Sequence, residues 1–408
     1  MNIRRKIIVT GIGNIMRNLV IGCGIAIILT IIYALFTSTQ QDIFSAILLS
    51  KKGPIYDSPS TVEMIQTRTT KVPTLFFPLT VKRTSEKRKE IAITVIVANN
   101  NNAKEYFLPQ ATLHCYAQAH NYTMLEVNLE QNPKYVKACP GKDFMFQRHC
   151  VMAMLMVEKP EIEWFAFLDA DIGVVNPNHL IEEYTHPDAD LVFYDRLFDN
   201  EITSGAYLVR NTKFSQSFLR HWAEYERKVI SGTVHGTDNG AVHQVFLDFF
   251  CSDCAPRRRE QCTKIWQNSH NYDDLFNFES CARELLGSAE WFKSPNGTVR
   301  QLSFGRGYWS RDGWLTDSKW SDDDFMFHGW KEYKRNGEWT SMFTVEDFDS
   351  AKCKDPSTVH FNFAYKPEFY GNNTEIQKRV LKAGYKSYNE HLKRLQNVVQ
   401  IHLKEAGI

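Results

Sequence analysis

Two aspartates follow an apolar run in the stretch EWFAFLDADIGVVNP, residues 163–177. Burying ionised carboxylates beside so many aromatic and aliphatic side chains costs several kcal/mol unless a counter-charge compensates for it. In an extended chain, residues two apart project to the same side, so Asp169 and Asp171 can converge while Ala170 faces away. Hard carboxylate oxygens suit Mn²⁺ or Mg²⁺, which complete their coordination shell with substrate phosphates. The pair therefore predicts a divalent-cation site that binds a diphosphate.

The simplest alternative is that the two aspartates only end a strand and begin a turn, where aspartate is common. A D-x-D triplet is a weak signal by itself, but here it follows an aromatic strand and other candidate groups lie further along the chain. His328 follows the apolar triplet FMF and precedes Gly329. A lone histidine is more often packed or solvent-facing, yet imidazole also suits Mn²⁺, so we predict that His328 is a third ligand.

The elements that position these residues alternate between strands and helices. The apolar, β-branched residues 91–98 are typical of a buried parallel strand, and a predicted helix at 104–120 separates it from a second strand at 122–128. The alternation continues with predicted helices at 144–159, 213–229 and 238–250, and with predicted strands at 164–169, 188–195 and 202–211. We therefore predict an α/β fold with a mostly parallel mixed sheet, flanking helices, and ligand sites at the carboxyl ends of strands.

Charge and hydropathy separate the amino terminus from the rest of the chain. The 48 Lys+Arg residues nearly equal the 47 Asp+Glu residues, which leaves no basic excess for nucleic-acid binding. Residues 19–36 carry no charge and as a helix would span roughly 27 Å, close to the thickness of a bilayer core. Basic residues precede this run, which predicts a membrane anchor with a cytosolic amino terminus. A cleaved signal peptide is disfavoured because the run is long and no clear cleavage site follows it.

Cysteine usage agrees with an oxidising compartment. Eight of the nine cysteines lie beyond the anchor, an even number that favours disulfides whose pairing the sequence does not reveal. The segment CSDCAPRRREQC, residues 251–262, contains a C-x-x-C pair, but a zinc site would need a fourth ligand such as Cys281, so we prefer disulfides there. The glycosylation sequons begin at Asn121, Asn296 and Asn372.

The segment HCVMAMLMVEKPEIEWFAFLDADIGVVNPN, residues 149–178, resembles the central segment of GT-A fold glycosyltransferases. The resemblance is greatest to family 34, which includes α-galactosyl, α-mannosyl and α-xylosyl transferases, and an uncharacterised nucleotide-diphospho-sugar transferase-like family has a similar pattern. In these enzymes a helix with a basic residue precedes a strand that ends in D-x-D, and the acids bind a nucleotide-sugar through Mn²⁺. The resemblance places Arg148, Asp169 and Asp171 at these positions.

Two further motifs follow in the same order. ITSGAYLVRN, residues 202–211, is similar to the family's strand that passes close to the sugar, with Ser204 and Gly205 at that place. TDNGAVHQ resembles the segment that carries an acid and an amide at the reacting carbon, which implies catalytic roles for Asp238 and Asn239. The family usually has glutamine where this chain has Asn239. The alternative for Asp238 is a helix N-cap, a common role for aspartate.

The last motif, FMFHGWK at residues 325–331, resembles the family's late His-Gly motif. The resemblance implies that His328 is a metal ligand and that Gly329 and Lys331 bind the diphosphate. Asn99 follows the first strand, where a nucleotide base commonly docks, although four consecutive asparagines can simply form a loop. Arg148 and Lys331 could also be ordinary solvated side chains.

These expectations combine into a domain plan and a function. We expect a cytosolic tail (1–18), a transmembrane signal anchor (19–36), a stem (37–88), a GT-A domain (89–350) with a cysteine-containing insertion (251–290), and a carboxyl-terminal helical extension (351–408). The resemblance implies a Golgi type II membrane protein that transfers a sugar from a UDP- or GDP-sugar to a glycan or glycoprotein acceptor. Transfer would depend on Mn²⁺ (or Mg²⁺) and retain the anomeric configuration. A homodimer is compatible with the sequence.

Two other classes of function compete with this interpretation. A catalytically inactive GT-A-fold sugar-binding protein of the secretory pathway would have no need of a diphosphate site, so Asp169, Asp171 and His328 argue against it. A glycosidase would require two separated carboxylates that flank a glycosidic bond rather than a D-x-D pair.

Overall fold

The structure is a computed structural model that describes residues 73–79, 90–100, 102–251, 254–287 and 289–405. The predicted tail and anchor, and most of the predicted stem, lie outside these residues. Among the helices that are described, none combines the length and the apolar composition needed to cross a bilayer.

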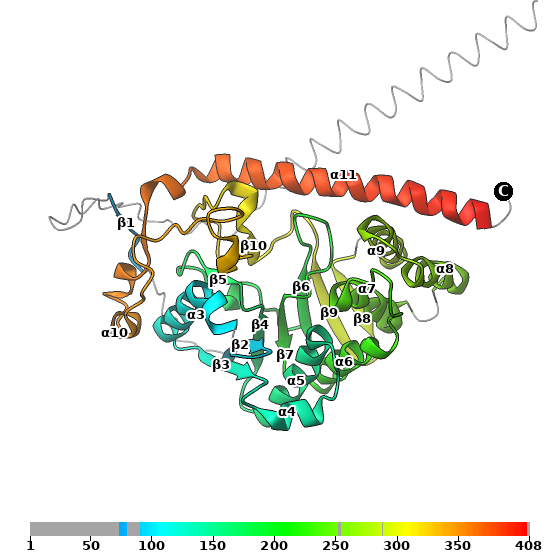
Figure 1. Cartoon of the computed structure of the whole chain (residues 1–408), viewed down its shortest axis with the longest axis horizontal. Helices are drawn as coiled ribbons and strands as arrows, with labels where there is room; N and C mark the ends of the chain where they lie inside the picture. The colour runs from blue at the N-terminus through cyan, green and yellow to red at the C-terminus, as the bar shows by residue number, and fades with distance from the viewer. Residues whose placement is uncertain (1–72, 80–89, 101, 252–253, 288, 406–408) are drawn as a thin grey trace, which may run out of the picture. The chain divides into compact units, whose positions relative to one another are not determined.

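Seven strands form the central sheet, in the order β3-β2-β4-β7-β6-β9-β8 (Figure 1). They are β2 (Ile91–Val97), β3 (Thr123–Asn128), β4 (Trp164–Leu168), β6 (Leu191–Tyr194), β7 (Ala206–Arg210), β8 (Trp291–Ser294) and β9 (Gly297–Leu302). Strand β2 is parallel to both β3 and β4, and β6 is parallel to β9, whereas β7 is antiparallel to both β4 and β6, and β8 is antiparallel to β9.

The predicted α/β class with a mixed sheet is confirmed, but the sheet is not mostly parallel. The connection between β6 and β7, residues 195–205, contains no helix. A parallel pair needs a long crossover, whereas a short loop returns the chain alongside the strand that it has just left. Strand β7 therefore runs in the opposite direction to its two neighbours, and it brings the loop before it to the carboxyl end of β4.

Helices cover both faces of the sheet. They include α2 (Asn102–Glu105), α3 (Phe107–His120), α4 (Pro133–Ala138), α5 (Phe144–Glu158), α6 (Lys213–Glu224) and α7 (Thr237–Phe250). Side chains alternate between the faces of β4, so Phe165 and Phe167 join one hydrophobic core with α5, α6 and α7. Trp164 and Leu168 join a second core with α3. Strand β4 is therefore buried on both sides, which explains its continuous apolar sequence.

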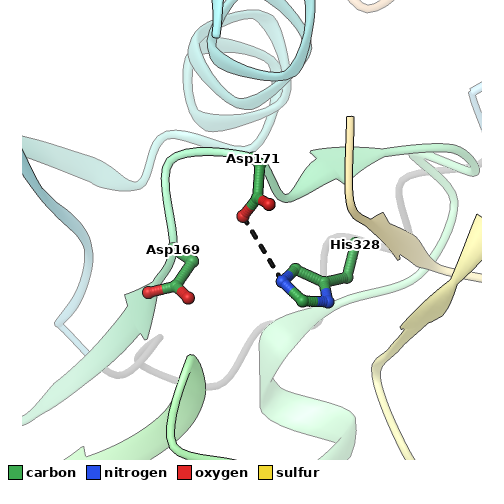
Figure 2. A group of neighbouring side chains, drawn as sticks. All are labelled: Asp169, Asp171 and His328. Atoms are coloured by element: carbon green, nitrogen blue, oxygen red, sulfur yellow. Dashed lines mark ion pairs between the residues drawn. The ribbon is translucent and has the colours of Figure 1, made fainter. Parts of the chain in front are cut away.

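A small three-stranded sheet lies beside the end of β4 (Figure 2). Its strands are β10 (Ser310–Asp312), β11 (Met326–His328) and β5 (Gly173–Val174), in the order β10-β11-β5. Because β5 begins two residues after the D-A-D triplet and pairs with β11, Phe327 lies opposite Gly173. The sheet thereby brings the end of β11 next to the two aspartates.

The cysteine-containing segment forms two helices, α8 (Pro256–Gln267) and α9 (Tyr272–Leu286). Cys262–Cys281 joins the two helices, and the disulfide Cys251–Cys254 precedes them in the sequence. The four cysteines therefore form disulfides, as we predicted, rather than a zinc site. The carboxyl-terminal residues form one long helix, α11 (Asn373–Glu405), which packs against α9.

The remaining elements are short. A two-stranded sheet pairs β1 (Leu75–Phe76) with β12 (Ala364–Tyr365). The other short helices are η1 (Ile181–Glu183), η2 (Tyr225–Arg227), η3 (Gly313–Thr316), η4 (Glu332–Lys334), η5 (Val359–Phe361), η6 (Pro367–Phe369) and α10 (Ser350–Lys354).

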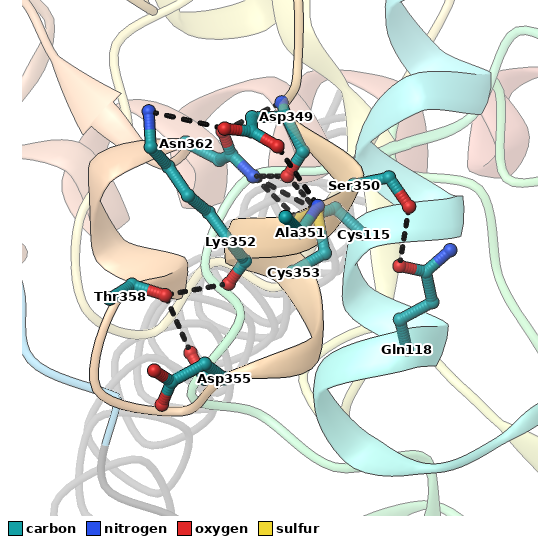
Figure 3. The surroundings of a disulfide bond; sticks show 10 residues. All are labelled: Cys115, Gln118, Asp349, Ser350, Ala351, Lys352, Cys353, Asp355, Thr358 and Asn362. Atoms are coloured by element: carbon teal, nitrogen blue, oxygen red, sulfur yellow. Dashed lines mark hydrogen bonds and ion pairs between the residues drawn. A yellow bond between two sulfur atoms is a disulfide. The ribbon is translucent and has the colours of Figure 1, made fainter.

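A disulfide between Cys115 on α3 and Cys353 on α10 joins residues 238 positions apart (Figure 3). The side chain of Asn362 donates to the Sγ atom of Cys353 at 2.9 Å and to the backbone carbonyl of Asp349 at 2.9 Å, so the surroundings of the bond are ordered by hydrogen bonds. We expect the double substitution Cys115→Ala/Cys353→Ala to lower the free energy of unfolding by about 2–5 kcal/mol, because the unfolded chain loses a constraint over a long loop.

Urea denaturation of the two chains measures this difference. The matched control is the pair Cys139–Cys150, which spans only 11 residues, and its removal should cost about 2–3 kcal/mol less on loop-entropy grounds. An equal or larger loss in the control would contradict the explanation.

Candidate active site

Three side chains that suit a divalent cation converge at the end of β4. Asp169 follows β4, Asp171 precedes β5, and His328 ends β11 (Figure 2). One ligand atom from each residue lies within 4.8 Å of the other two. The Nε2 atom of His328 lies 3.4 Å from Oδ1 of Asp171. Two oxygens and one imidazole nitrogen at this spacing fit Mn²⁺, and small side-chain movements would bring all three into a coordination sphere.

Backbone contacts hold these ligands in place. The amide N–H of Asp169 donates to the carbonyl of Gly205 at 2.7 Å, and the N–H of Trp330 donates to the carbonyl of Asp171 at 3.0 Å. A Cβ atom at Gly205 would collide with the carboxylate of Asp169, so only glycine lets β7 pass this close. Gly329 has φ +93°, a conformation that favours glycine, and it turns the chain directly after His328.

His328 lies between two carboxylates. Its Nε2 faces Asp171, and its Nδ1 lies 3.0 Å from Oδ1 of Asp312, which is opposite His328 in the β10–β11 pair. Burial alone would lower the pKa of His328, but the two carboxylates outweigh it and raise the pKa to about 10. Burial would raise the pKa of Asp171, but the charges of His328 and Lys331 lower it below its ordinary value. Nζ of Lys331 lies 3.9 Å from Oδ2 of Asp171.

A buried arginine connects the metal ligands to α7. Arg148 on α5, only 3% exposed, pairs through NH1 with Asp169 and through NH2 with Asp238 at 2.6 Å. Nε2 of His149 lies 2.9 Å from the same oxygen of Asp238, and the His149 ring stacks on Trp222. Burial would raise the pKa of Asp238, but Arg148 and His149 lower it to about 2. Burial lowers the pKa of His149 to about 4, so this ring is neutral at neutral pH.

Arg148 and Asp238 belong to a buried network that contacts Asp169, one of the candidate metal ligands. Asp238 is 0% exposed and its carboxylate is already bound by three side chains, those of Arg148, His149 and Thr237, which favours a role in orienting Arg148 and Asp169. Its predicted contact with the reacting carbon, and the predicted contact of Arg148 with substrate, stay predictions.

A pocket opens beside Asp169 and His328, and Ser204, Gly205 and Asn239 also line it. The hydroxyl of Ser204 donates to the side-chain carbonyl of Asn239. The predicted sugar-facing strand and the predicted amide therefore meet at one wall of this pocket.

The other predicted residues lie at the surface or at the sheet edge. Asn99 follows β2 by two residues, at the same edge of the sheet as Asp169 because β2 and β4 are parallel. Its role in base binding stays a prediction. The asparagines of the sequons are all exposed: Asn121, Asn296 and Asn372.

Our sequence reasoning missed several charged residues of the site. Asp312 binds His328, and Arg196 donates to both carboxylate oxygens of Asp312, at 3.1 and 2.8 Å. Glu201 lines the pocket. The sequence SRDGW, residues 310–314, also has an acid at the end of a short strand, but no apolar run precedes this acid as one precedes the D-A-D triplet. Glu201 and Arg196 lie in an irregular loop, where no periodicity marks them.

The proton on His328 competes with a cation for the same nitrogen, and this gives a pH prediction. The pKa of His328 is raised from 6.5 to about 10. The ion pairs of protonated His328 with Asp171 and Asp312 therefore stabilise the fold fully below pH 6.5, and this stabilisation is lost as the pH rises through about 10. Mn²⁺ must displace this proton, so its affinity should rise up to about tenfold per pH unit between pH 6 and 9. Isothermal titration calorimetry measures this slope, and His328→Gln should bind more weakly with a flatter slope. A pH-independent affinity in the native chain would contradict His328 as a ligand.

Comparisons with known proteins place this site in context. A family model described as "Protein of unknown function, DUF273" matches residues 113–344, more than half of the chain. No curated protein matches the sequence. Among the solved structures that show some similarity are two whose TM-scores are too low to carry an inference. One is a glycosyltransferase involved in the glycosylation of the major capsid of PBCV-1, with 18% identity over 38% of this chain and 75% of that chain and a TM-score of 0.29. The other is a protein from STIV, with 11% identity over 37% of this chain and 74% of that chain and a TM-score of 0.21.

Proposed function

We propose that this chain, which belongs to the DUF273 family of proteins of unknown function, is a metal-dependent glycosyltransferase. It would transfer a sugar from a nucleotide-diphospho-sugar to a glycan acceptor. The observation that carries the proposal is the convergence of Asp169, Asp171 and His328 at the carboxyl end of β4, where their ligand atoms lie within 4.8 Å of one another. The pocket beside them and the nearby Lys331 are what a diphosphate site requires.

The balance of charge around the ligands supports a cation and a diphosphate that bind together. With His328 protonated, four aspartates face an equal number of cationic groups: Asp169, Asp171, Asp238 and Asp312 face Arg148, Arg196, His328 and Lys331. Two further acids, Asp199 and Glu201, lie near Arg196, and burial raises the pKa of both. A divalent cation that displaces the His328 proton adds one net positive charge. A diphosphate supplies more than enough negative charge to balance it, so cation and donor should bind more tightly together than separately.

Different residues of the site would have different roles in the transfer of the sugar. A cation held by Asp169, Asp171 and His328 would supply Lewis-acid neutralisation of the departing diphosphate. Lys331 would add a second positive charge to the diphosphate oxygens. Asn239, at the pocket wall with Ser204, would orient the sugar, while the buried pair of Arg148 and Asp238 holds Asp169 in place.

The finer features of the proposal rest on the sequence. Imidazole in the ligand set favours Mn²⁺ over Mg²⁺. The uncharged run at 19–36 supports a Golgi type II membrane protein, and the disulfides and exposed sequons suit a lumenal domain. Retention of the anomeric configuration and a UDP- or GDP-sugar donor follow from the resemblance to family 34.

A thermal-shift screen of the purified chain against UDP, GDP and CMP, each with and without Mn²⁺, tests the proposal. We expect one of the uridine or guanosine nucleotides to raise the melting temperature, and only when Mn²⁺ is present. Sugars carried by the responding nucleotide then form a donor panel, in which Mn²⁺-dependent release of UDP or GDP identifies the donor. Binding without turnover across the whole panel would instead support the catalytically inactive sugar-binding protein. The absence of any response to nucleotide would overturn the proposal.

A further inference from the structure

Two aromatic side chains that are not buried, Phe198 and Trp314, contact each other at the surface. Phe198 is 48% exposed and belongs to the loop between β6 and β7, and Trp314 is partly exposed and belongs to η3. The centroids of the two rings lie 4.9 Å apart, and the ring planes are inclined by 78°. Two segments that are far apart in the sequence therefore present one aromatic surface, which we call the aromatic pair.

A chain of contacts connects the aromatic pair to the pocket. The guanidinium carbon of Arg196 lies 5.8 Å from the ring centroid of Phe198, and Arg196 lines the pocket. The same guanidinium donates to both carboxylate oxygens of Asp312, which also lines the pocket. Phe198 follows Arg196 by two residues, and Trp314 likewise follows Asp312 by two residues. Each aromatic side chain is therefore carried by a segment that has just formed part of the pocket wall.

The chain on which the aromatic pair is mounted is fixed by α11. Leu197, next to Phe198, is 5% exposed and packs in a hydrophobic cluster with residues of α11. Leu315, next to Trp314, packs against the same cluster. The aromatic side chains are therefore held at the surface by leucines that pack inward beside them. A surface that is ordered in advance loses little conformational entropy when a ligand binds to it.

A hydrogen-bond donor lies beside the exposed ring of Phe198. Single apolar side chains at a surface need no explanation, but this pair adjoins a charged, planar group. Nε and NH2 of Arg196 donate to Asp312. NH1 of Arg196 lies 3.6 Å from Oδ2 of Asp199 and 3.7 Å from Oε2 of Glu201, both beyond ordinary hydrogen-bond length. NH1 therefore keeps the capacity to donate to a ligand that packs on the ring.

The aromatic pair is separate from the proposed diphosphate site. The imidazole of His328 has Asp171, the neighbour of Lys331, at Nε2, and it has Asp312 at Nδ1. These two nitrogens face different directions. The contacts that lead to the aromatic pair begin at Nδ1, through Asp312 and Arg196. The diphosphate of the donor therefore does not require this surface, which leaves it for the acceptor.

A pyranose ring matches both features of this surface. The C–H bonds on one face of a pyranose have slightly positive hydrogens, and the face of an aromatic ring is slightly negative. The hydroxyl groups at the edge of the sugar form hydrogen bonds, as NH1 of Arg196 requires. Ligand sites commonly combine aromatic walls with a few placed polar groups in this way.

We propose that the aromatic pair is the acceptor subsite and that it binds a pyranose of the glycan acceptor, an inference that rests on the glycosyl transfer proposed above. The sugar packs its apolar face on Phe198 and Trp314 and accepts a hydrogen bond from Arg196. The acceptor group is therefore the hydroxyl of a sugar rather than that of an unglycosylated serine or threonine. Because the aromatic pair only binds, it governs the affinity for the acceptor and not the chemical step.

The test measures transfer from the donor found in the nucleotide-sugar panel to methyl glycosides of glucose, galactose, mannose, xylose and N-acetylglucosamine, in both anomeric forms. We expect Phe198→Ala and Trp314→Ala each to raise the KM for the accepted glycoside about 5–50-fold, while kcat changes less than about threefold. The KM for the donor and its slow hydrolysis by water should also change less than about threefold, because neither uses the aromatic pair.

Control variants separate stacking from folding. Phe198→Tyr and Trp314→Phe keep an aromatic face and should retain most of the acceptor affinity. Phe198→Leu keeps apolar volume without that face and should raise the KM as alanine does, which keeps the test valid where an alanine variant does not fold. The matched control is Tyr272→Ala, which removes a 68% exposed aromatic side chain that contacts another ring but does not line the pocket. Its KM values should equal those of the native chain.

The outcomes distinguish this inference from the proposed function. Native acceptor KM values in Phe198→Ala and Trp314→Ala would overturn the inference and leave the proposed function intact. A loss of donor hydrolysis as large as the loss of transfer would also overturn it, because the aromatic pair would then be structural. Hydrolysis of the donor by the native chain without transfer to any glycoside would overturn it as well. Failure of the native chain to bind any nucleotide would remove the proposed function itself, and this inference with it.

Discussion

Replacing Asp171 with alanine is expected to weaken Mn²⁺ binding by more than about 100-fold, because even residues outside a coordination shell cost 10–100-fold when they are removed. The side chain of Asp171 is buried and forms ion pairs with both His328 and Lys331. Without it, the two cations repel an incoming metal ion, and only two of the three ligand side chains remain. Mn²⁺-dependent nucleotide binding and donor turnover should fall together.

Calorimetry with Mn²⁺ alone measures this loss without any assumption about the donor. Asp188→Ala is the matched control, because its side chain is 82% exposed and lies on a surface turn. Asp171→Asn keeps the shape of the side chain and should lose the same affinity, which separates charge from packing. Native affinity in both Asp171 variants would contradict the metal site.

Arg148→Met should destabilise the fold by about 3–5 kcal/mol, the cost of leaving a buried charge without its partner. Asp238 is completely buried, and the charge of Arg148 is the largest of the contributions that lower its pKa to about 2. In the native chain this ionised state contributes stability above the ordinary pKa of about 3.8, and the contribution is lost as the pH falls through about 2. In the variant the pKa of Asp238 should rise, so the loss of stability should shrink as the pH is lowered.

Urea denaturation at pH 5 and pH 8 measures both effects. Arg258→Met is the control, because this arginine pairs with Glu284 at the surface, with side chains 46% and 38% exposed. Such pairs contribute about 0–1 kcal/mol, so the control should remain close to the native stability. If Arg148→Met lowers the free energy of unfolding by less than about 1 kcal/mol, the prediction is wrong, because Asp238 would then not be left as an unpaired buried charge.

The parts of the fold that the sequence predicts are those with a strong apolar pattern. Strand β4 is buried throughout and helix α5 over most of its length, so the apolar pattern predicts their bounds to within about one residue. The predicted helix at 238–250 corresponds to α7, and the single helix α11 follows its amphipathic pattern. Strands β8 and β9 were missed because they form a hairpin of short, mixed-polarity strands in which pairing, rather than hydropathy, fixes the structure.

The site was predictable where a residue type carries its own chemistry. Asp169, Asp171 and His328 were found because each weak signal, carboxylates at a strand end and a histidine before glycine, occurs with the others in one alternating α/β pattern. The partners of Arg148 were not predictable, because Asp238 is 90 residues away and only tertiary packing brings the two together. Glu201 depends on a loop whose course is set by the antiparallel return of β7, and no spacing in the sequence reveals that reversal.

The candidate metal ligands come from separate parts of the architecture, since two follow a strand of the large sheet and the third ends a strand of the small one. A bound cation would therefore link the seven-stranded sheet to the three-stranded sheet. Under the proposed function, the small sheet would be held most rigidly while cation and nucleotide are bound, and it would become more mobile each time that nucleotide departs.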